Sequence, residues 1–138
     1  MELASKKVSV LASDRAVFDM LINCNNIKKY IPNDKVKDWQ STESTCSFYV
    51  EGAGKMEMSI QKKTPCSSVI YSIGNNLAKG AIICFSINKI DSGQENICEL
   101  GAKTSLEVPF FMAKMLESTL QKFIDMLIDY IKIAVEKH

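Results

Sequence analysis

The feature that most constrains the fold is a long apolar run at the end of the chain, from residue 109 to residue 138. Polar residues recur in this run at intervals of three or four: Lys114, Glu117, Gln121, Asp125, Asp129, Lys132 and Glu136. This spacing predicts a single helix with one solvent-facing stripe. At 1.5 Å per residue the helix would be about 40 Å long, which exceeds the width of a small domain.

The apolar side of this helix is unusually broad. It contains Met112, Met115, Leu116, Leu120, Phe123, Ile124, Leu127, Ile128, Ile131 and Val135. A helix that lies on a flat sheet needs a narrower apolar stripe, so the wide arc predicts a sheet that curls around the helix. Pro109 is expected in the first helical turn, where its missing amide hydrogen has no cost.

Most of the preceding sequence alternates between apolar and polar residues, which is typical of β-strands. Strands are predicted over residues 3–11, 46–52, 55–63, 67–73, 81–90 and 96–108. Gly52-Ala53-Gly54 predicts a hairpin turn, and other short turns separate the later strands. We therefore expect about six or seven antiparallel strands in a sheet of meander type.

Two short helices are expected after the first strand. Ser13 occupies an N-cap position and Asp14 the first turn of one of them. The other covers residues 27–31 and ends at Pro32, which disfavours helical geometry in the residue before it. The predicted fold class is α+β, as a single domain over residues 1–138.

This order of elements resembles the helix-grip fold of the START/polyketide-cyclase (SRPBCC) superfamily, with its small uncharacterised bacterial members the most similar. The resemblance lies in NNIKKYIP at 25–32, in DWQSTESTCSFYVEGAGKMEMSI at 38–60, and in the final helix. It implies a curved antiparallel sheet around the C-terminal helix, with a hydrophobic or amphipathic small molecule held between them. Members of the superfamily include polyketide cyclases and dehydratases, lipid or hormone carriers, and modulators of chaperones or membrane complexes.

The inward faces of the predicted strands and helix define a candidate ligand pocket. Its residues are Phe48, Met56, Met58, Tyr71, Ile83, Phe85, Leu100, Ala102, Met112, Met115, Leu116 and Leu120. Methionine adapts to varied apolar partners, although plain core filling explains these residues as well. Ala102 and Thr104 are small residues at positions where a packed core would favour larger ones, which favours a cavity.

Binding of a hydrophobic small molecule without transformation is the function that the sequence favours. One alternative is an enzyme of the cyclase or dehydratase type. The strand carboxylates Glu57, Glu99 and Glu107 alternate with apolar neighbours, so they are expected to face solvent. No catalytic residue is therefore assigned. Another alternative is an adaptor that docks a protein or a membrane through Phe110 and Phe111.

The charge and cysteine content argue against several other classes of function and of binding site. The net charge of +1 argues against a nucleic-acid partner. The five cysteines are widely spaced and the single histidine is the last residue, so we expect no metal, no cofactor and reduced thiols. The first residues lack the apolar core of a signal peptide, which favours a cytoplasmic location. The oligomeric state is left open.

Overall fold

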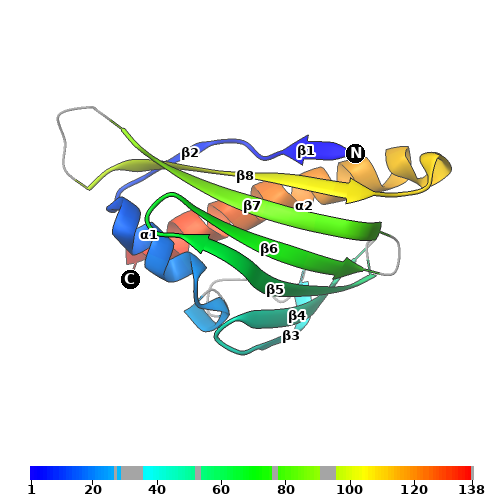
Figure 1. Cartoon of the computed structure of the whole chain (residues 1–138), viewed down its shortest axis with the longest axis horizontal. Helices are drawn as coiled ribbons and strands as arrows, with labels where there is room; N and C mark the ends of the chain where they lie inside the picture. Colours follow the sequence, from blue (N-terminus) through cyan, green and yellow to red (C-terminus); the bar gives the residue numbers. More distant parts are fainter. Residues whose placement is uncertain (27, 29–35, 52–53, 76–77, 91–95, 138) are drawn as a thin grey trace.

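The structure is a computed structural model that describes residues 1–26, 28, 36–51, 54–75, 78–90 and 96–137. Its main layer is an antiparallel sheet (Figure 1). The strands are β1 (Glu2–Ala4), β2 (Val8–Val10), β3 (Val36–Ser41), β4 (Thr45–Val50), β5 (Gly54–Thr64), β6 (Ser68–Asn75), β7 (Ala78–Lys89) and β8 (Cys98–Glu107). Their order is β1-β8-β7-β6-β5-β4-β3, and β2 also pairs with β8.

The second layer is the long helix α2 (Phe110–Lys137), which runs lengthwise beneath the twisted sheet (Figure 1). Its buried residues are Leu116, Phe123, Ile124, Leu127, Ile128, Ile131, Ala134 and Val135. They pack against the inward face of the sheet in one continuous core. The predicted helix-grip arrangement is confirmed. The carbonyl of Pro109 accepts a hydrogen bond from the Met112 amide at 2.9 Å, so this proline lies just before the first helical residue.

The short helix α1 (Asp14–Leu21) lies beside the C-terminal part of α2 (Figure 1). The predicted N-cap is confirmed, because the Ser13 hydroxyl accepts a hydrogen bond from the Ala16 amide at 3.1 Å. A single 3-10 turn, η1 (Cys24–Asn26), follows α1. The second helix expected over residues 27–31 lies outside the described residues, apart from residue 28.

Two strand predictions need correction. The expected first strand at 3–11 is two short strands, because residues 5–7 leave the ladder between β1 and β2. The strand β3 was missed, since its alternation of apolar and polar residues is interrupted. Its pairing with β4 shifts between Lys37 and Gln40, and Asp38 adopts a positive φ of 56°. A bulge of this kind destroys the period of two on which sequence patterns depend.

The polar stripe of α2 is not simply solvent-facing, as the sequence predicted. Residues 4–11 form an N-terminal strap that covers part of it. The contacts are Gln121 Nε2 to the Ala4 carbonyl (2.8 Å), the Lys6 amide to Asp125 (2.8 Å), Lys6 Nζ to Asp129 (2.7 Å), Lys132 Nζ to the Ser9 carbonyl (2.7 Å) and the Leu11 amide to Glu136 (2.9 Å). Burial alone would raise the pKa of Glu136, but the Leu11 amide and the Lys132 ammonium outweigh it and lower this pKa.

Candidate functional site

Between the sheet and α2, the residues that the structure describes enclose a small cavity of about 20 Å³, which is room for about one water molecule. We call it the thiol cavity. It is lined by Leu21, Cys24, Trp39, Cys46, Phe48, Met58, Tyr71, Phe85 and Leu127.

Tyr71 brings a hydroxyl group into this apolar region. The hydroxyl donates a short hydrogen bond to the Leu21 carbonyl at the end of α1. It also lies 3.5 Å from the Cys24 sulfur atom. Burial raises the pKa of Tyr71 strongly, so the phenol stays neutral and can act as a donor. The sequence-based expectation that this hydroxyl needs an interior partner is met by a backbone carbonyl.

Three aromatic rings form an aromatic stack beside the cavity. Phe48 on β4 is the middle ring, with its centroid 5.0 Å from that of Trp39 on β3 and 5.6 Å from that of Phe123 on α2. The interplanar angles of 12° and 28° are those of stacked rings. The stack therefore connects one edge of the sheet to the long helix.

Trp39 carries the one buried side-chain polar atom that lacks a hydrogen-bond partner among the described residues. This atom is the indole Nε1, whose N–H group can only donate. A buried donor without an acceptor costs roughly 1–3 kcal/mol. The aromatic stack thus includes a hydrogen-bond donor that an acceptor on a bound molecule would satisfy.

A side groove of about 330 Å³ lies at the Phe123 end of the stack, whereas Trp39 and Phe48 line the thiol cavity. Its walls are the end of β4 and one face of α2, and they consist of Val50, Glu51, Thr119, Lys122, Phe123 and Met126. Phe123 belongs to both the groove wall and the aromatic stack. The Phe48–Phe123 pair consequently separates the side groove from the thiol cavity.

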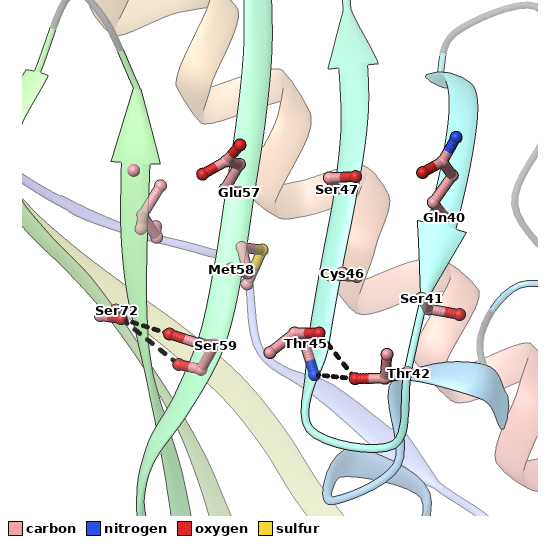
Figure 2. Close-up of a pocket in the computed structure, with 12 residues that line it drawn as sticks. Gln40, Ser41, Thr42, Thr45, Cys46, Ser47, Glu57, Met58, Ser59 and Ser72 are labelled. Atoms are coloured by element: carbon pink, nitrogen blue, oxygen red, sulfur yellow. Dashed lines mark hydrogen bonds between the residues drawn. The ribbon is translucent and has the colours of Figure 1, made fainter.

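A larger hollow of about 680 Å³, the outer trough, lies on the sheet face that points away from α2 (Figure 2). Short side chains on neighbouring strands leave this space, and their hydroxyl groups pair with each other. Ser59 and Ser72 are 2.8 Å apart, and Thr42 and Thr45 are 2.6 Å apart, measured between hydroxyl oxygens. Glu57 projects into the trough and pairs with Lys55 at 3.5 Å. The lining of the trough is mixed, because Cys46, Met58 and Ile73 contribute beside these polar groups, and the trough lies outside the space between the sheet and α2.

The structure brings only part of the predicted pocket together. Phe48, Met58, Tyr71 and Phe85 line the thiol cavity. Five further predicted residues are buried but line neither the cavity nor the groove: Met56, Ile83, Leu100, Ala102 and Leu116. The small side chain of Ala102 lies opposite the large Phe85 ring in the β7–β8 register, and it lines none of the hollows formed by the described residues. The assignment of these residues to a ligand site stays a prediction.

The start of α2 differs from the expectation. Met112 and Leu120 are half-buried, whereas Met115 is 65% exposed and does not lie on the inward face. Leu116 next to it is buried, so the broad apolar face of α2 is narrower at the start of the helix than farther along, where Phe123 and Ile124 are both buried. Phe110 and Phe111 are 94% and 83% exposed. Together with Met115 they form an apolar tip.

None of the strand carboxylates Glu57, Glu99 and Glu107 lines the thiol cavity or the side groove. Glu57 and Glu107 are exposed, as predicted. The Glu99 side chain is 38% exposed and lies 4.0 Å from Lys7 Nζ.

Among the described residues no group of three or more histidine, cysteine, aspartate or glutamate side chains is placed to hold a metal ion. None of the described helices is long and apolar enough to cross a membrane.

Sequence reasoning missed Cys24, Trp39 and the whole side groove. One signal for the groove was present, because Thr119, Lys122, Phe123 and Met126 are spaced i, i+3, i+4 and i+7. Such residues share one helix face, and this face mixes apolar and polar side chains. Trp39 and Cys24 had no such signal, since one is next to the β3 bulge and the other lies in a single 3-10 turn.

Comparisons with known proteins identify the architecture. No protein-family model matches the sequence, and no curated protein matches it significantly. Among solved structures, a START superfamily protein from Mycobacterium smegmatis is similar with a TM-score of 0.74 and 14% identity, over 99% of this chain and 97% of that one. A conserved protein from Geobacillus kaustophilus is similar with a TM-score of 0.72 and 12% identity, over 99% of this chain and 96% of that one. Norcoclaurine synthase from Thalictrum flavum was solved in complex with dopamine and hydroxybenzaldehyde. It is similar with a TM-score of 0.76 and 10% identity, over 100% of this chain and 87% of that one.

Proposed function

We propose that this chain, which has the helix-grip fold of START superfamily proteins, binds a hydrophobic or amphipathic small molecule that reaches the interior through the side groove. The observation that carries the proposal is the position of the Phe48–Phe123 pair, with the side groove on one side and the thiol cavity on the other. Rotation of these two rings would join the two spaces. The pair therefore acts as a gate between solvent and the interior.

The lining of the side groove fits an amphipathic ligand. Its volume of about 330 Å³ lies at the lower end of the range for small-molecule pockets. Val50, Phe123 and Met126 supply apolar contacts, while Glu51 and Lys122 supply charges. The unpartnered Trp39 N–H offers a hydrogen bond to an acceptor on the ligand once the stack has opened. Norcoclaurine synthase, with the same fold, holds two small aromatic molecules, which supports a ligand of that size.

Binding without transformation is the simplest form of this proposal. The titratable groups at the thiol cavity are two cysteines and a tyrosine, and the structure places Glu57 and Glu107 in solvent. A ligand that buries about 400 Å² of apolar surface gains about 10 kcal/mol, and association costs at least about 4 kcal/mol. The remaining free energy of roughly 6 kcal/mol corresponds to a dissociation constant of tens of micromolar.

Two tryptophan substitutions on α2 test this route. Thr119→Trp places an indole in the side groove, so it should weaken binding of the fluorescent probe 1-anilinonaphthalene-8-sulfonate by at least about tenfold, or about 1.4 kcal/mol. Ser118→Trp is the matched control, because Ser118 is the preceding residue, is exposed and lies outside the groove. It should leave the dissociation constant within about twofold of the wild-type value. Equal effects of both variants, or no binding by the wild type, would contradict the proposal.

The apolar tip favours a second candidate function, that of an adaptor that inserts this tip into a lipid surface. Phe110, Phe111 and Met115 are all mostly exposed at the start of α2. Full burial of a phenylalanine side chain is worth about 1.5–3 kcal/mol, so the two rings together support reversible attachment.

Vesicle co-sedimentation tests the adaptor function. Replacement of both Phe110 and Phe111 with serine should reduce the bound fraction on phosphatidylcholine vesicles by at least about tenfold. Ile133→Ser, which changes an exposed apolar residue near the other end of α2, should have little effect. Absence of vesicle binding by the wild type would exclude the lipid surface and leave a protein as the partner of this tip.

A further inference from the structure

Two thiols that are distant in sequence meet in the thiol cavity. Cys24 and Cys46 both line it, so their side chains border the same space of about 20 Å³. They are 2% and 8% exposed, and both are free thiols. A disulfide forms when the two sulfur atoms approach to about 2.05 Å, and the thiol cavity is the space across which they would meet.

The backbone around both residues is held together independently of the thiols. The Cys24 amide donates a hydrogen bond to the Glu43 carbonyl at 2.9 Å, just before β4 begins. The Ser41 hydroxyl donates another to the Asn25 side-chain oxygen at 2.6 Å. These bonds fix η1 against the β3–β4 turn, so the proximity of Cys24 and Cys46 is built into the fold.

The two thiols differ in reactivity. The pKa of Cys24 falls to about 7, mainly through its interaction with the neighbouring Cys46 thiol, which outweighs the opposite effect of burial. The pKa of Cys46 is raised by the same contact and by burial. The lowered pKa of Cys24 increases its thiolate fraction, and the thiolate is the nucleophilic form.

We propose that Cys24 and Cys46 form a reversible redox pair, in which a peroxide converts the two thiols into a disulfide across the thiol cavity. The Cys24 thiolate attacks one peroxide oxygen, the O–O bond breaks, and the hydroxide that leaves takes up a proton to give water. The Cys46 sulfur then attacks the sulfenic acid on Cys24, and a second water leaves. Two thiols and one hydrogen peroxide thus give one disulfide and two waters, with the sulfurs oxidised and the peroxide reduced.

The disulfide would change the interior of the protein. It would connect η1 to β4 covalently next to Tyr71 and the aromatic stack. Closure of the loop between the two cysteines constrains the unfolded chain and raises the Tm. The same bond limits the separation of η1 from the sheet, so the oxidised interior opens less than the reduced one.

Thiol counting with peptide mapping tests the redox pair. Denatured protein that has not been treated with peroxide should show all five cysteines free to react with iodoacetamide. After hydrogen peroxide, two should be lost, the mass should fall by two hydrogens, and one cross-linked peptide pair should contain Cys24 and Cys46. Dithiothreitol should restore the full count. The rate should rise with pH around pH 7, as the Cys24 thiolate forms.

Two variants complete the test. Cys46→Ala should stop the reaction at a sulfenic acid on Cys24 that dimedone traps, with no intramolecular disulfide. Cys84→Ala should still form the disulfide, because Cys84 does not line the cavity. The proposal is wrong if Cys24 and Cys46 of the wild type stay reactive to iodoacetamide at a dose that oxidises Cys66 or Cys84. It is also wrong if Cys46→Ala still loses two thiols within one molecule.

Discussion

Ala102→Trp should destabilise the protein markedly, with a loss of about 3 kcal/mol and a fall in Tm of roughly 10 °C. Ala102 is 4% exposed, faces α2 and lies opposite Phe85 in the β7–β8 register. Its backbone is also fixed, because its amide and carbonyl both bond to Ser5 at 2.8 Å. An indole at this position has no space without displacement of its neighbours. A thermal melt followed by circular dichroism measures the effect.

Lys103→Trp is the matched control for this substitution. Lys103 is the next residue on β8, is exposed and points to the opposite face of the sheet. Its replacement should change the free energy of unfolding by less than about 0.5 kcal/mol. If Ala102→Trp instead kept a near-normal Tm and abolished probe binding, the interior would hold an open cavity at Ala102, as the sequence predicted.

Phe48→Ala should have the larger effect, a loss of about 3–5 kcal/mol in the free energy of unfolding. Phe48 is 2% exposed and is the middle ring of the aromatic stack, so its removal deletes both ring contacts and leaves a hole. The hole would also join the side groove to the thiol cavity, so the folded fraction should bind the apolar probe more tightly. Urea unfolding at low temperature gives the first quantity, and probe titration gives the second.

Tyr49→Ala provides the comparison for Phe48→Ala. Tyr49 is the next residue on β4, is 48% exposed and points to the outer face. Its loss should cost no more than about 1 kcal/mol. Similar losses for the two variants would show that the aromatic stack contributes little to stability, and the gate would then lack its structural basis.

The periodicity of the sequence predicted the strands and the long helix well, because burial on one face imposes a regular pattern. The alternation in residues 46–50 and 98–106 matches the buried positions of β4 and β8. The same reasoning failed where regularity is interrupted, at the bulge around Asp38 and at residues 5–7. Periodicity also assigned Lys132 and Glu136 to solvent, although they form hydrogen bonds with the backbone of Ser9 and Leu11. A polar stripe has the same sequence pattern whether its side chains bond to water or to a distant backbone segment.

The site was less predictable than the fold. The inward positions of Phe48, Tyr71 and Phe85 followed from alternation, but a list of inward residues does not reveal whether the space between them is filled. Phe85 and Ala102 lie opposite each other because of the register between β7 and β8. The sequence of neither strand alone specifies this register. The meeting of Cys24 and Cys46 depends on how η1 folds back onto the sheet, which local patterns do not encode.

The pairing of β1 and β2 with β8 also has a consequence for the rate of folding. The first ten residues find their sheet partner only in residues 98–107, and α1 packs against α2. At about 5–20 residues per second during synthesis, Val10 waits on the order of ten seconds for its strand partner Cys98. Contacts so distant in sequence must also overcome a large loop-closure entropy, so refolding should take milliseconds to seconds rather than microseconds. Until β8 and α2 emerge, the apolar faces of the earlier strands stay uncovered, and a chaperone that shields them would protect the chain from aggregation.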